Sequence, residues 1–130
     1  MKTRLAALFL ALGLAATPAV PAFAAVTYRD AQGVLHLNLD TKLIPPLGAG
    51  NYEGTLQLTV SKNGIVNGYY RPNGESFNSV VGGLNGDEIW LDIGYNGGMH
   101  ISGRLQGGKI VGSTFIGTRL FDFKASPQTN

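Results

Sequence analysis

The side chains that most often carry catalysis or bind metals are scarce in this chain of 130 residues. It contains two histidines, His36 and His100, eight acidic residues and no cysteine. Neither histidine has a metal-ligand spacing to the other or to an acid. No Gly-x-Ser-x-Gly elbow presents a nucleophilic serine, and no glycine-rich loop leads into a helix to hold phosphate. We therefore expect a protein that is not an enzyme and has no metal or cofactor.

The chain between residues 51 and 125 contains a turn signal about every eleven residues. Asn-Gly and Gly-Gly pairs supply the positive-φ residues that tight hairpins need. These pairs are Asn63-Gly64, Asn73-Gly74, Asn85-Gly86, Asn96-Gly97 and Gly107-Gly108, followed by Gly117-Thr118. The runs between them alternate apolar and polar residues, which is the period of a half-buried strand. The pattern predicts an antiparallel meander.

No amphipathic helix follows the N-terminal segment, so the sheet must cover its own apolar face. We predict an all-β fold in which about eight to nine short strands close into a small β-barrel, with a β-sandwich as the alternative. Glycines 54, 68, 83, 103 and 112 are predicted to lie on the core face, where they permit the coiling of a small barrel. The side chains predicted to face the core are Leu56, Leu58, Val60, Val66, Tyr70, Phe77, Val81, Ile89, Leu91, Ile93, Ile101, Leu105, Ile110, Phe121 and Phe123.

Turn chemistry also predicts which residues lie opposite one another. In each predicted register the loop suits its glycine and the large apolar residues stay on one face. At Pro72 these two demands conflict, and the register of that hairpin stays open. The predicted pairs include Tyr28–Leu37, Val60–Val66, Val81–Ile89, Ile93–Ile101, Leu105–Ile110 and Thr114–Phe121.

The first residues have the organisation of a secretory signal peptide. Lys2 and Arg4 precede an apolar run, and small residues end at Ala24. The run is shorter than the roughly 20 residues that span a bilayer. We predict a signal peptide over residues 1–24 and one β domain over residues 25–130, exported to the periplasm or secreted.

The predicted β domain has three parts. Residues 26–40 read as an N-terminal hairpin, and residues 51–125 form the meander. Residues 41–50 contain Pro45 and Pro46, which cannot donate hydrogen bonds to a neighbouring strand. We therefore interpret residues 41–50 as a connection that covers one end of the core, either as a plain cap or as a lid over a ligand.

The charge of the exported chain excludes two classes of partner. Without Lys2 and Arg4 the ten basic residues become eight, which balance the eight acidic residues. Binding to nucleic acid or to an anionic membrane surface requires a clustered basic face, and the sequence has no run of basic residues. The predicted strands are also shorter than the roughly 9 to 11 residues of membrane-spanning strands.

Residues 50–70, GNYEGTLQLTVSKNGIVNGYY, resemble the first hairpin of the avidin-like barrels. The resemblance covers this hairpin and implies a barrel. The tryptophan-lined ligand pocket of that family has no counterpart, because Trp90 is the only tryptophan. No ligand residues follow from the resemblance.

Two functions remain open. In the first, the barrel interior holds a small, mostly apolar molecule between bulky aliphatic side chains and core-face glycines. The residues predicted to bind it are Tyr70, Phe77, Leu91, Ile101, Gly103, Phe121 and Phe123.

In the second function, the outer face of the sheet binds a protein partner or a second copy of the chain. Tryptophan and arginine are enriched at the centres of protein interfaces. The predicted registers set Trp90 opposite Arg104 and gather a histidine and an aromatic ring beside them. The predicted partner-binding residues are Trp90, Arg104, His100 and Phe115.

Overall fold

A computed structural model describes residues 27–47, 50–95 and 98–129. The described residues form nine antiparallel strands and no helix. The strands are β1 (Thr27–Arg29), β2 (Leu35–Ile44), β3 (Tyr52–Val60), β4 (Ile65–Pro72), β5 (Asn78–Asn85), β6 (Glu88–Ile93), β7 (Met99–Gln106), β8 (Lys109–Ile116) and β9 (Arg119–Pro127). In this part of the chain, no helix is long and apolar enough to cross a membrane.

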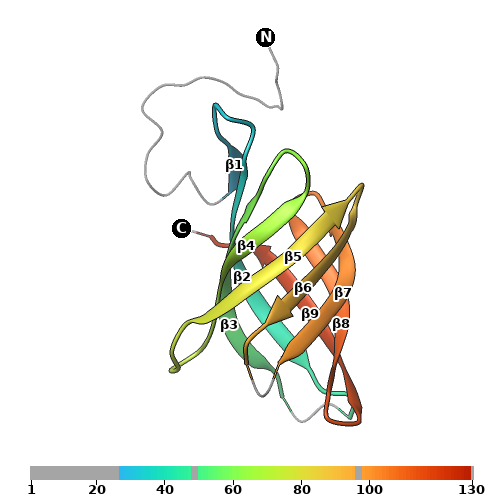
Figure 1. Cartoon of the computed structure of the whole chain (residues 1–130). Coiled ribbons are helices and arrows are strands. Elements are labelled where there is room, and N and C mark those ends of the chain that lie inside the picture. The colour runs from blue at the N-terminus through green and yellow to red at the C-terminus, as the bar shows by residue number, and fades with distance from the viewer. Residues whose placement is uncertain (1–26, 48–49, 96–97, 130) are drawn as a thin grey trace.

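The strands follow one another in chain order, and β2 also pairs with β9. This pairing closes β2 to β9 into a barrel, as predicted, and β1 adds one strand outside the ring (Figure 1). β1 stands beyond one end of the barrel, on the side where β9 ends (Figure 1). Closure leaves the barrel without a free sheet edge where β2 and β9 pair.

The barrel interior is a close-packed core of alternate side chains from every strand of the ring. Leu39, Leu56, Leu91, Ile101 and Phe123 are each 0% exposed. All but three of the side chains predicted to face the core are buried. Leu105 is half-buried against the core, whereas Phe77 and Val81 are exposed on the outside. Phe77 lies beside the hairpin whose register the sequence left open, and Val81 belongs to the hairpin whose register was predicted incorrectly.

Three hairpins have the predicted registers. Val60 pairs with Val66, Leu105 with Ile110, and Thr114 with Phe121. In the first of these hairpins Gly64 has a φ of 85°, the left-handed conformation that the loop was predicted to require. Local turn chemistry was therefore sufficient to place these strands.

The predicted register between β5 and β6 is wrong. Ile89 pairs with Leu84, not with Val81, because a two-residue turn begins at Gly86, whose φ is 66°. The observed register is shifted from the predicted one by an odd number of residues, and such a shift exchanges the inward and outward faces of β5. Val80 is consequently buried at 2% exposure, whereas Val81 is 54% exposed.

The same shift moves Gly83 to the outer face of the barrel. Gly83 lies opposite Trp90, and a Cβ atom on Gly83 would meet the indole ring at 2.2 Å. Trp90 therefore lies across Gly83 on the outside, and Gly82 takes the inward position opposite Leu91. Gly83 was predicted to face the core, and this prediction is wrong.

The register between β6 and β7 differs from the prediction by two residues. Ile93 pairs with Met99 instead of Ile101, and Ile101 pairs with Leu91. A shift of two residues keeps each side chain on its predicted face. The turn pair Asn96-Gly97, on which the prediction relied, lies outside the described residues.

The hairpin that the sequence left open pairs Tyr70 with Asn78. Its loop begins at Pro72, whose carbonyl accepts a hydrogen bond from the Glu75 N–H at 3.1 Å. Phe77 then lies on the outer face, where its ring meets Tyr69 edge-on with centroids 6.2 Å apart. Phe77 was predicted to face the core, so its predicted position is wrong.

The N-terminal hairpin is one residue out of the predicted register, since Tyr28 pairs with His36 and not with Leu37. β2 also continues to Ile44, which shortens the connection predicted over residues 41–50. Thr41 and Leu43 continue the inward alternation of β2, each at 2% exposure. Residues 1–26, which include the predicted signal peptide, lie outside the described residues.

Candidate binding site at the open end of the barrel

The residues predicted to hold a ligand lie in three different places. Leu91, Ile101 and Phe123 are fully buried in the close-packed core. Phe77 lies on the outer face. Tyr70 and Phe121 line a pocket at one end of the barrel. The structure therefore brings two of the predicted residues together at a barrel end.

Gly103 does not border an internal cavity. It lies opposite Gly112, and a Cβ atom on Gly103 would be 2.4 Å from the Val111 carbonyl oxygen and 2.8 Å from the Gly112 Cα. Because neither Gly103 nor Gly112 has a side chain, the backbones of the two strands can approach each other closely. A leucine at position 103 would therefore have no room.

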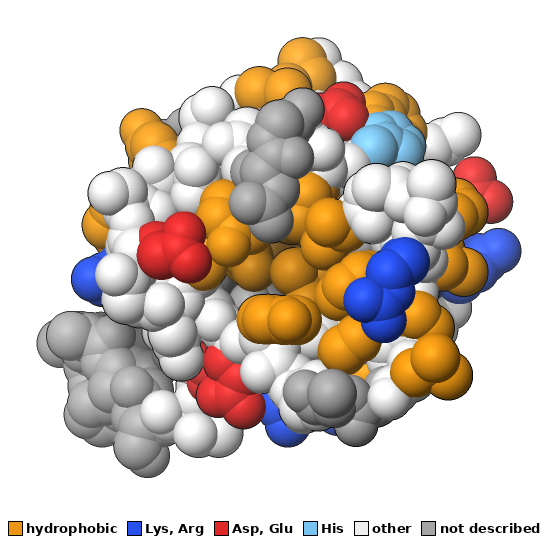
Figure 2. Space-filling model, turned by 90° about the horizontal axis from the view of Figure 1, so that it is seen from below, with side chains coloured by type: hydrophobic (Ala, Val, Ile, Leu, Met, Phe, Trp, Pro, Cys, Tyr) orange, Lys and Arg blue, Asp and Glu red, His pale blue; other side chains and the backbone are white. Residues whose placement is uncertain are grey.

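The mouth pocket, as we call the hollow at the open end, has a volume of about 560 Å³. This size falls in the range of pockets that hold small molecules. Figure 2 views this end of the barrel and shows hydrophobic side chains gathered around the hollow. The residues that line it are Leu43, Asn51, Tyr52, Glu53, Tyr70, Pro72, Asn73, Glu75, Tyr95, Ile116 and Phe121.

The mouth pocket is built from the ends of strands and the loops between them. Leu43 and Tyr70 lie near the ends of β2 and β4, and Ile116 is the last residue of β8. Tyr52 begins β3, and Tyr95 follows β6 in the loop to β7. An up-and-down barrel brings alternate loops to the same end, so residues distant in sequence meet there.

Four aromatic rings form two pairs in the mouth pocket. The rings of Tyr70 and Tyr95 meet edge-to-face, with centroids 5.8 Å apart and an angle of 69°. The rings of Tyr52 and Phe121 have centroids 6.3 Å apart. Tyr70 and Phe121 are buried, whereas Tyr52 is 61% exposed. The pocket thus has an apolar floor and a partly exposed aromatic rim.

Polar groups lie along the rim of the pocket. The Tyr95 hydroxyl donates to the Glu75 carboxylate at 3.3 Å. The Arg71 side chain donates to the Glu75 carbonyl at 3.0 Å, which holds the loop that carries Glu75. The Arg119 guanidinium lies over the Phe121 ring, 5.8 Å from its centroid. An apolar molecule in this pocket would meet these charged and polar groups at its outer end.

Burial raises the pKa of the Tyr70 phenol above its ordinary value. The neighbouring Thr41 hydroxyl opposes this rise in the pKa, while Tyr95 and Glu75 add to it. The Tyr70 hydroxyl is therefore protonated at neutral pH. It supplies the buried floor of the pocket with a neutral group able to donate a hydrogen bond.

The predicted pairing of Trp90 with Arg104 on the outer face is wrong. Trp90 lies opposite Ser102, and Arg104 lies opposite Glu88. Arg104 forms an ion pair with Asp87 at 2.7 Å and reaches Glu88 at 3.8 Å. The two-residue shift between β6 and β7 separates Trp90 from Arg104, and the guanidinium that was expected to cover the indole pairs with acidic residues instead.

The other two predicted partner-binding residues are exposed on the outer face. His100 lies opposite Asp92, and its Nδ1 is 2.7 Å from the Asp92 carboxylate. Phe115 is 64% exposed and lies opposite Leu120. Among the described residues, no group of three or more histidines and acids is arranged to hold a metal ion.

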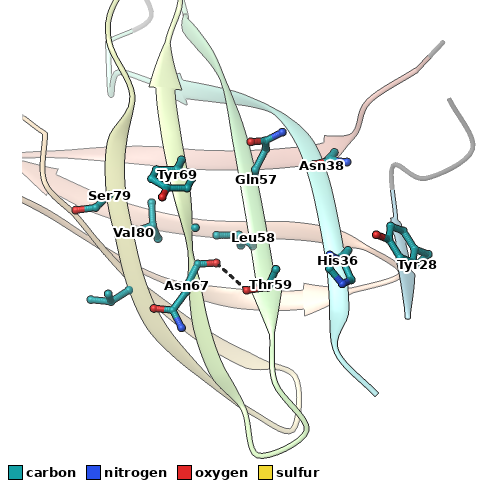
Figure 3. Close-up of a pocket in the computed structure, with 12 residues that line it drawn as sticks. Tyr28, His36, Asn38, Gln57, Leu58, Thr59, Asn67, Tyr69, Ser79 and Val80 are labelled. Atoms are coloured by element: carbon teal, nitrogen blue, oxygen red, sulfur yellow. Dashed lines mark hydrogen bonds between the residues drawn. The ribbon is translucent and has the colours of Figure 1, made fainter. Parts of the chain in front are cut away.

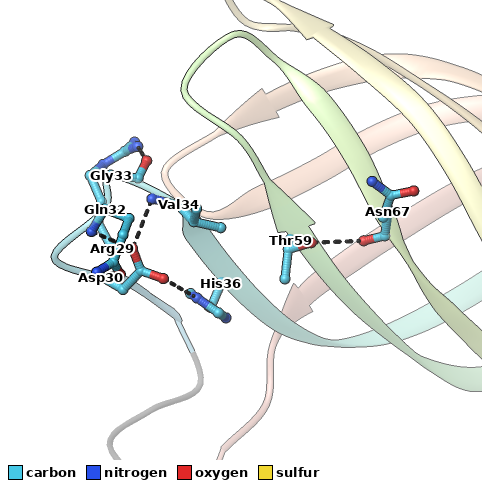
Figure 4. A network of polar contacts seen from close by, with 8 residues as sticks. All are labelled: Arg29, Asp30, Gln32, Gly33, Val34, His36, Thr59 and Asn67. Carbon is cyan, nitrogen blue, oxygen red and sulfur yellow. Dashed lines mark hydrogen bonds and ion pairs between the residues drawn. The ribbon is translucent and has the colours of Figure 1, made fainter.

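A polar network holds the turn between β1 and β2 (Figure 4). The Asp30 carboxylate accepts hydrogen bonds from the backbone N–H groups of Gln32 at 2.9 Å and Val34 at 3.0 Å. Its second oxygen lies 2.8 Å from Nε2 of His36. The hydrogen bond with His36, followed by that with Val34, lowers the pKa of Asp30 below its ordinary value of 3.8.

Acid should release this turn before it disturbs the barrel. A lowered pKa in the folded state stabilises the turn above pH 3.8, and this stabilisation is lost as the pH falls through the lowered pKa. We expect the NMR signals of the Tyr28 and His36 rings to shift in that range, and Asp30→Asn to remove the transition. Asp40→Asn is the matched control, because Asp40 is an exposed carboxylate on β2. An unchanged transition in Asp30→Asn would contradict the assignment.

Sequence reasoning missed most of the mouth pocket, including Leu43, Tyr52, Glu75, Tyr95 and Ile116. These residues lie at strand ends or in loops, where the alternation that identified the core stops. One signal was present, because Tyr52 and Tyr95 are aromatic residues placed directly beside predicted turns. A search for aromatic residues next to turns at the same barrel end would have found them.

The chain has no match among protein-family models, among curated proteins or among solved structures.

Proposed function

We propose that this protein is an exported, non-catalytic binding protein that holds a small, mostly apolar molecule in the mouth pocket. The observation that carries the proposal is the contrast between the two parts of the barrel. The middle is filled by side chains such as Leu56 and Leu91, whereas one end opens into a pocket of about 560 Å³ with aromatic walls. A packed interior with an aromatic mouth at one end suits a ligand that enters from that end.

The composition of the pocket defines the ligand class. Leu43, Ile116 and Phe121 offer an apolar surface, and the tyrosine rings offer flat faces for a ring system. Glu53 and Glu75 lie on the lining with the Tyr95 hydroxyl and favour a hydrogen-bond donor at the outer end of the ligand. The proposed ligand is therefore a neutral or weakly basic molecule with an apolar ring system and one donor group.

The small-molecule function is preferred to the protein-binding function for a structural reason. The protein-binding hypothesis depended on a cluster centred on Trp90 and Arg104. Arg104 instead pairs with acidic neighbours, and Trp90 covers Gly83. The mouth pocket keeps two residues of the first hypothesis, Tyr70 and Phe121, and adds two more rings.

The proposal is tested with N-phenyl-1-naphthylamine, a neutral aromatic amine whose fluorescence rises in apolar surroundings. We expect the wild-type chain to bind the dye with a Kd below about 100 µM. Ile116→Trp should fill the mouth and weaken binding by at least about tenfold. Val111→Trp is the matched control, because Val111 is on the same strand, faces outward and is 58% exposed.

Two outcomes would contradict the proposal. One is a wild-type chain that leaves the dye fluorescence unchanged. The other is equal loss of binding in Ile116→Trp and Val111→Trp, which would place the dye outside the mouth. Circular dichroism of both variants checks that the barrel is retained, and native mass spectrometry of protein purified from its own host identifies a retained ligand by mass.

A further inference from the structure

A second concave site lies on the outer face of the barrel, away from the mouth pocket. This outer groove has a volume of about 580 Å³ and crosses the strands from β1 to β5. Figure 3 shows the residues that line it on these strands. Leu58 and Val80 are buried in the core, and the outward side chains form the surface of the groove. The residues that line it are Tyr28, His36, Asn38, Gln57, Leu58, Thr59, Asn67, Gly68, Tyr69, Ser79, Val80 and Val81.

The strand registers arrange the outward side chains of the groove in two rows. One row runs Tyr28–His36–Thr59–Asn67–Val81, each residue directly opposite the next on the neighbouring strand. The second row runs Asn38–Gln57–Tyr69–Ser79 in the same way. Such rows cross the strands at right angles with a spacing of roughly 4.8 Å per strand. The outward side chains of the groove therefore lie in two regular rows across the strands.

The outer groove is lined by polar and apolar side chains and one histidine. Among the described residues that line it there is no lysine, arginine, aspartate or glutamate. The side-chain amides of Gln57 and Asn67 form no hydrogen bond within the described part of the chain. Each amide offers two donor hydrogens and an acceptor oxygen, so neighbouring amides can hydrogen-bond adjacent hydroxyl groups of a ligand. These groups complement a neutral, hydroxyl-rich molecule.

Two aromatic rings stand in the groove, and both are held in place. The Tyr28 ring stacks on His36 with centroids 4.5 Å apart and an angle of 2°. Asp30 fixes His36 in turn, as described above. The Tyr69 ring is braced edge-on by Phe77 at 6.2 Å. Tyr28 and Tyr69 are about half-exposed and lie on strands three steps apart, roughly 14 Å.

We propose that the outer groove binds an uncharged oligosaccharide a few sugar units long. The apolar C–H face of a sugar ring packs on a tyrosine ring, and its hydroxyl groups exchange hydrogen bonds with amides and hydroxyls. The groove offers both kinds of contact, in two rows, over the length of a short chain. A nucleic acid or an acidic polymer finds no lysine or arginine among the residues that line the groove. The groove is separate from the mouth pocket, so each site can be tested without the other.

The test uses isothermal titration calorimetry of the whole chain against neutral hexasaccharides. The panel contains β-1,4-linked glucose, α-1,4-linked glucose, β-1,4-linked mannose and β-1,4-linked N-acetylglucosamine. We expect at least one of them to bind with a Kd below about 1 mM. Tyr69→Ala, and separately the pair Gln57→Ala with Asn67→Ala, should weaken that binding by at least about tenfold.

Phe115→Ala is the matched control, because Phe115 is an exposed aromatic residue on the outer face but outside the groove. It should leave the Kd within about twofold of the wild-type value. No binding by any member of the panel would overturn the proposal, as would equal loss in Tyr69→Ala and Phe115→Ala. A wild-type dimer that Tyr69→Ala dissociates would also overturn it, since the groove would then be filled by a second copy of the chain.

Discussion

Phe123→Ala should lower the free energy of unfolding by about 3 to 5 kcal/mol, the largest loss expected from a single truncation in this barrel. Phe123 is 0% exposed and lies in β9 between Leu43 of β2 and Gly112 of β8. Because Gly112 has no side chain, it cannot move into the space that the ring leaves. The cavity should therefore persist, and its cost adds to the lost burial. Urea denaturation at an unchanged m value measures the effect.

Phe115→Ala is the control for this prediction. Phe115 lies on the neighbouring strand β8 but is 64% exposed. Its truncation should change the free energy of unfolding by less than about 0.5 kcal/mol. Equal losses in the two variants would show that the inner and outer faces of β8 and β9 are not as described.

The second large effect concerns two adjacent valines. Val80→Asp should lower the free energy of unfolding by at least about 3 kcal/mol, because it places an unpaired carboxyl group in an apolar core. Val80 is 2% exposed, whereas Val81 is 54% exposed. Val81→Asp should cost no more than about 1 kcal/mol, which arises mainly from Asp92 directly opposite it.

The valine comparison decides the register of β5 directly. The register predicted from turn chemistry reverses the ranking of the two variants, so a less stable Val81→Asp would refute the structure. If Val80→Asp does not fold, the milder pair Val80→Ala and Val81→Ala preserves the test. Val80→Ala should then lose about 1 to 3 kcal/mol, and Val81→Ala less than about 0.5 kcal/mol.

The meander and most of its core could be predicted from the sequence because both depend on neighbouring residues. Gly64 and Gly107-Gly108 occupy loops whose length allows one good register. Once the register is fixed, the alternation of apolar and polar residues on either side of the loop decides which side chains face inward. Side-chain direction has a period of two in any strand. For that reason the inward position of Val60, Val66 and Ile110 follows from local chemistry alone.

The register at β5 and β6 could not be predicted because two turns are equally good locally. Residues 84–86 suit a three-residue loop, whereas Gly86-Asp87 suits a two-residue turn. Contacts from β7 stabilise the second. Asp87 accepts hydrogen bonds from the side chains of Arg104 and Gln106, each at 2.7 Å. On the neighbouring strand, the Trp90 ring covers Gly83. Arg104 and Gln106 are distant in sequence from Asp87, and Trp90 packs on the face of the sheet, so turn chemistry includes neither kind of contact.

Both candidate sites depend on the closed barrel. The mouth pocket collects Leu43, Tyr70, Tyr95 and Phe121 from separate hairpins, and they meet only because β2 pairs with β9. The outer groove needs four successive registers to be correct, and the sequence predicted only that between β3 and β4. Local sequence determined that the chain forms strands and which hairpins are tight. Pairing over long distances determined which side chains share a surface, because the position of each strand is set by contacts on both of its sides.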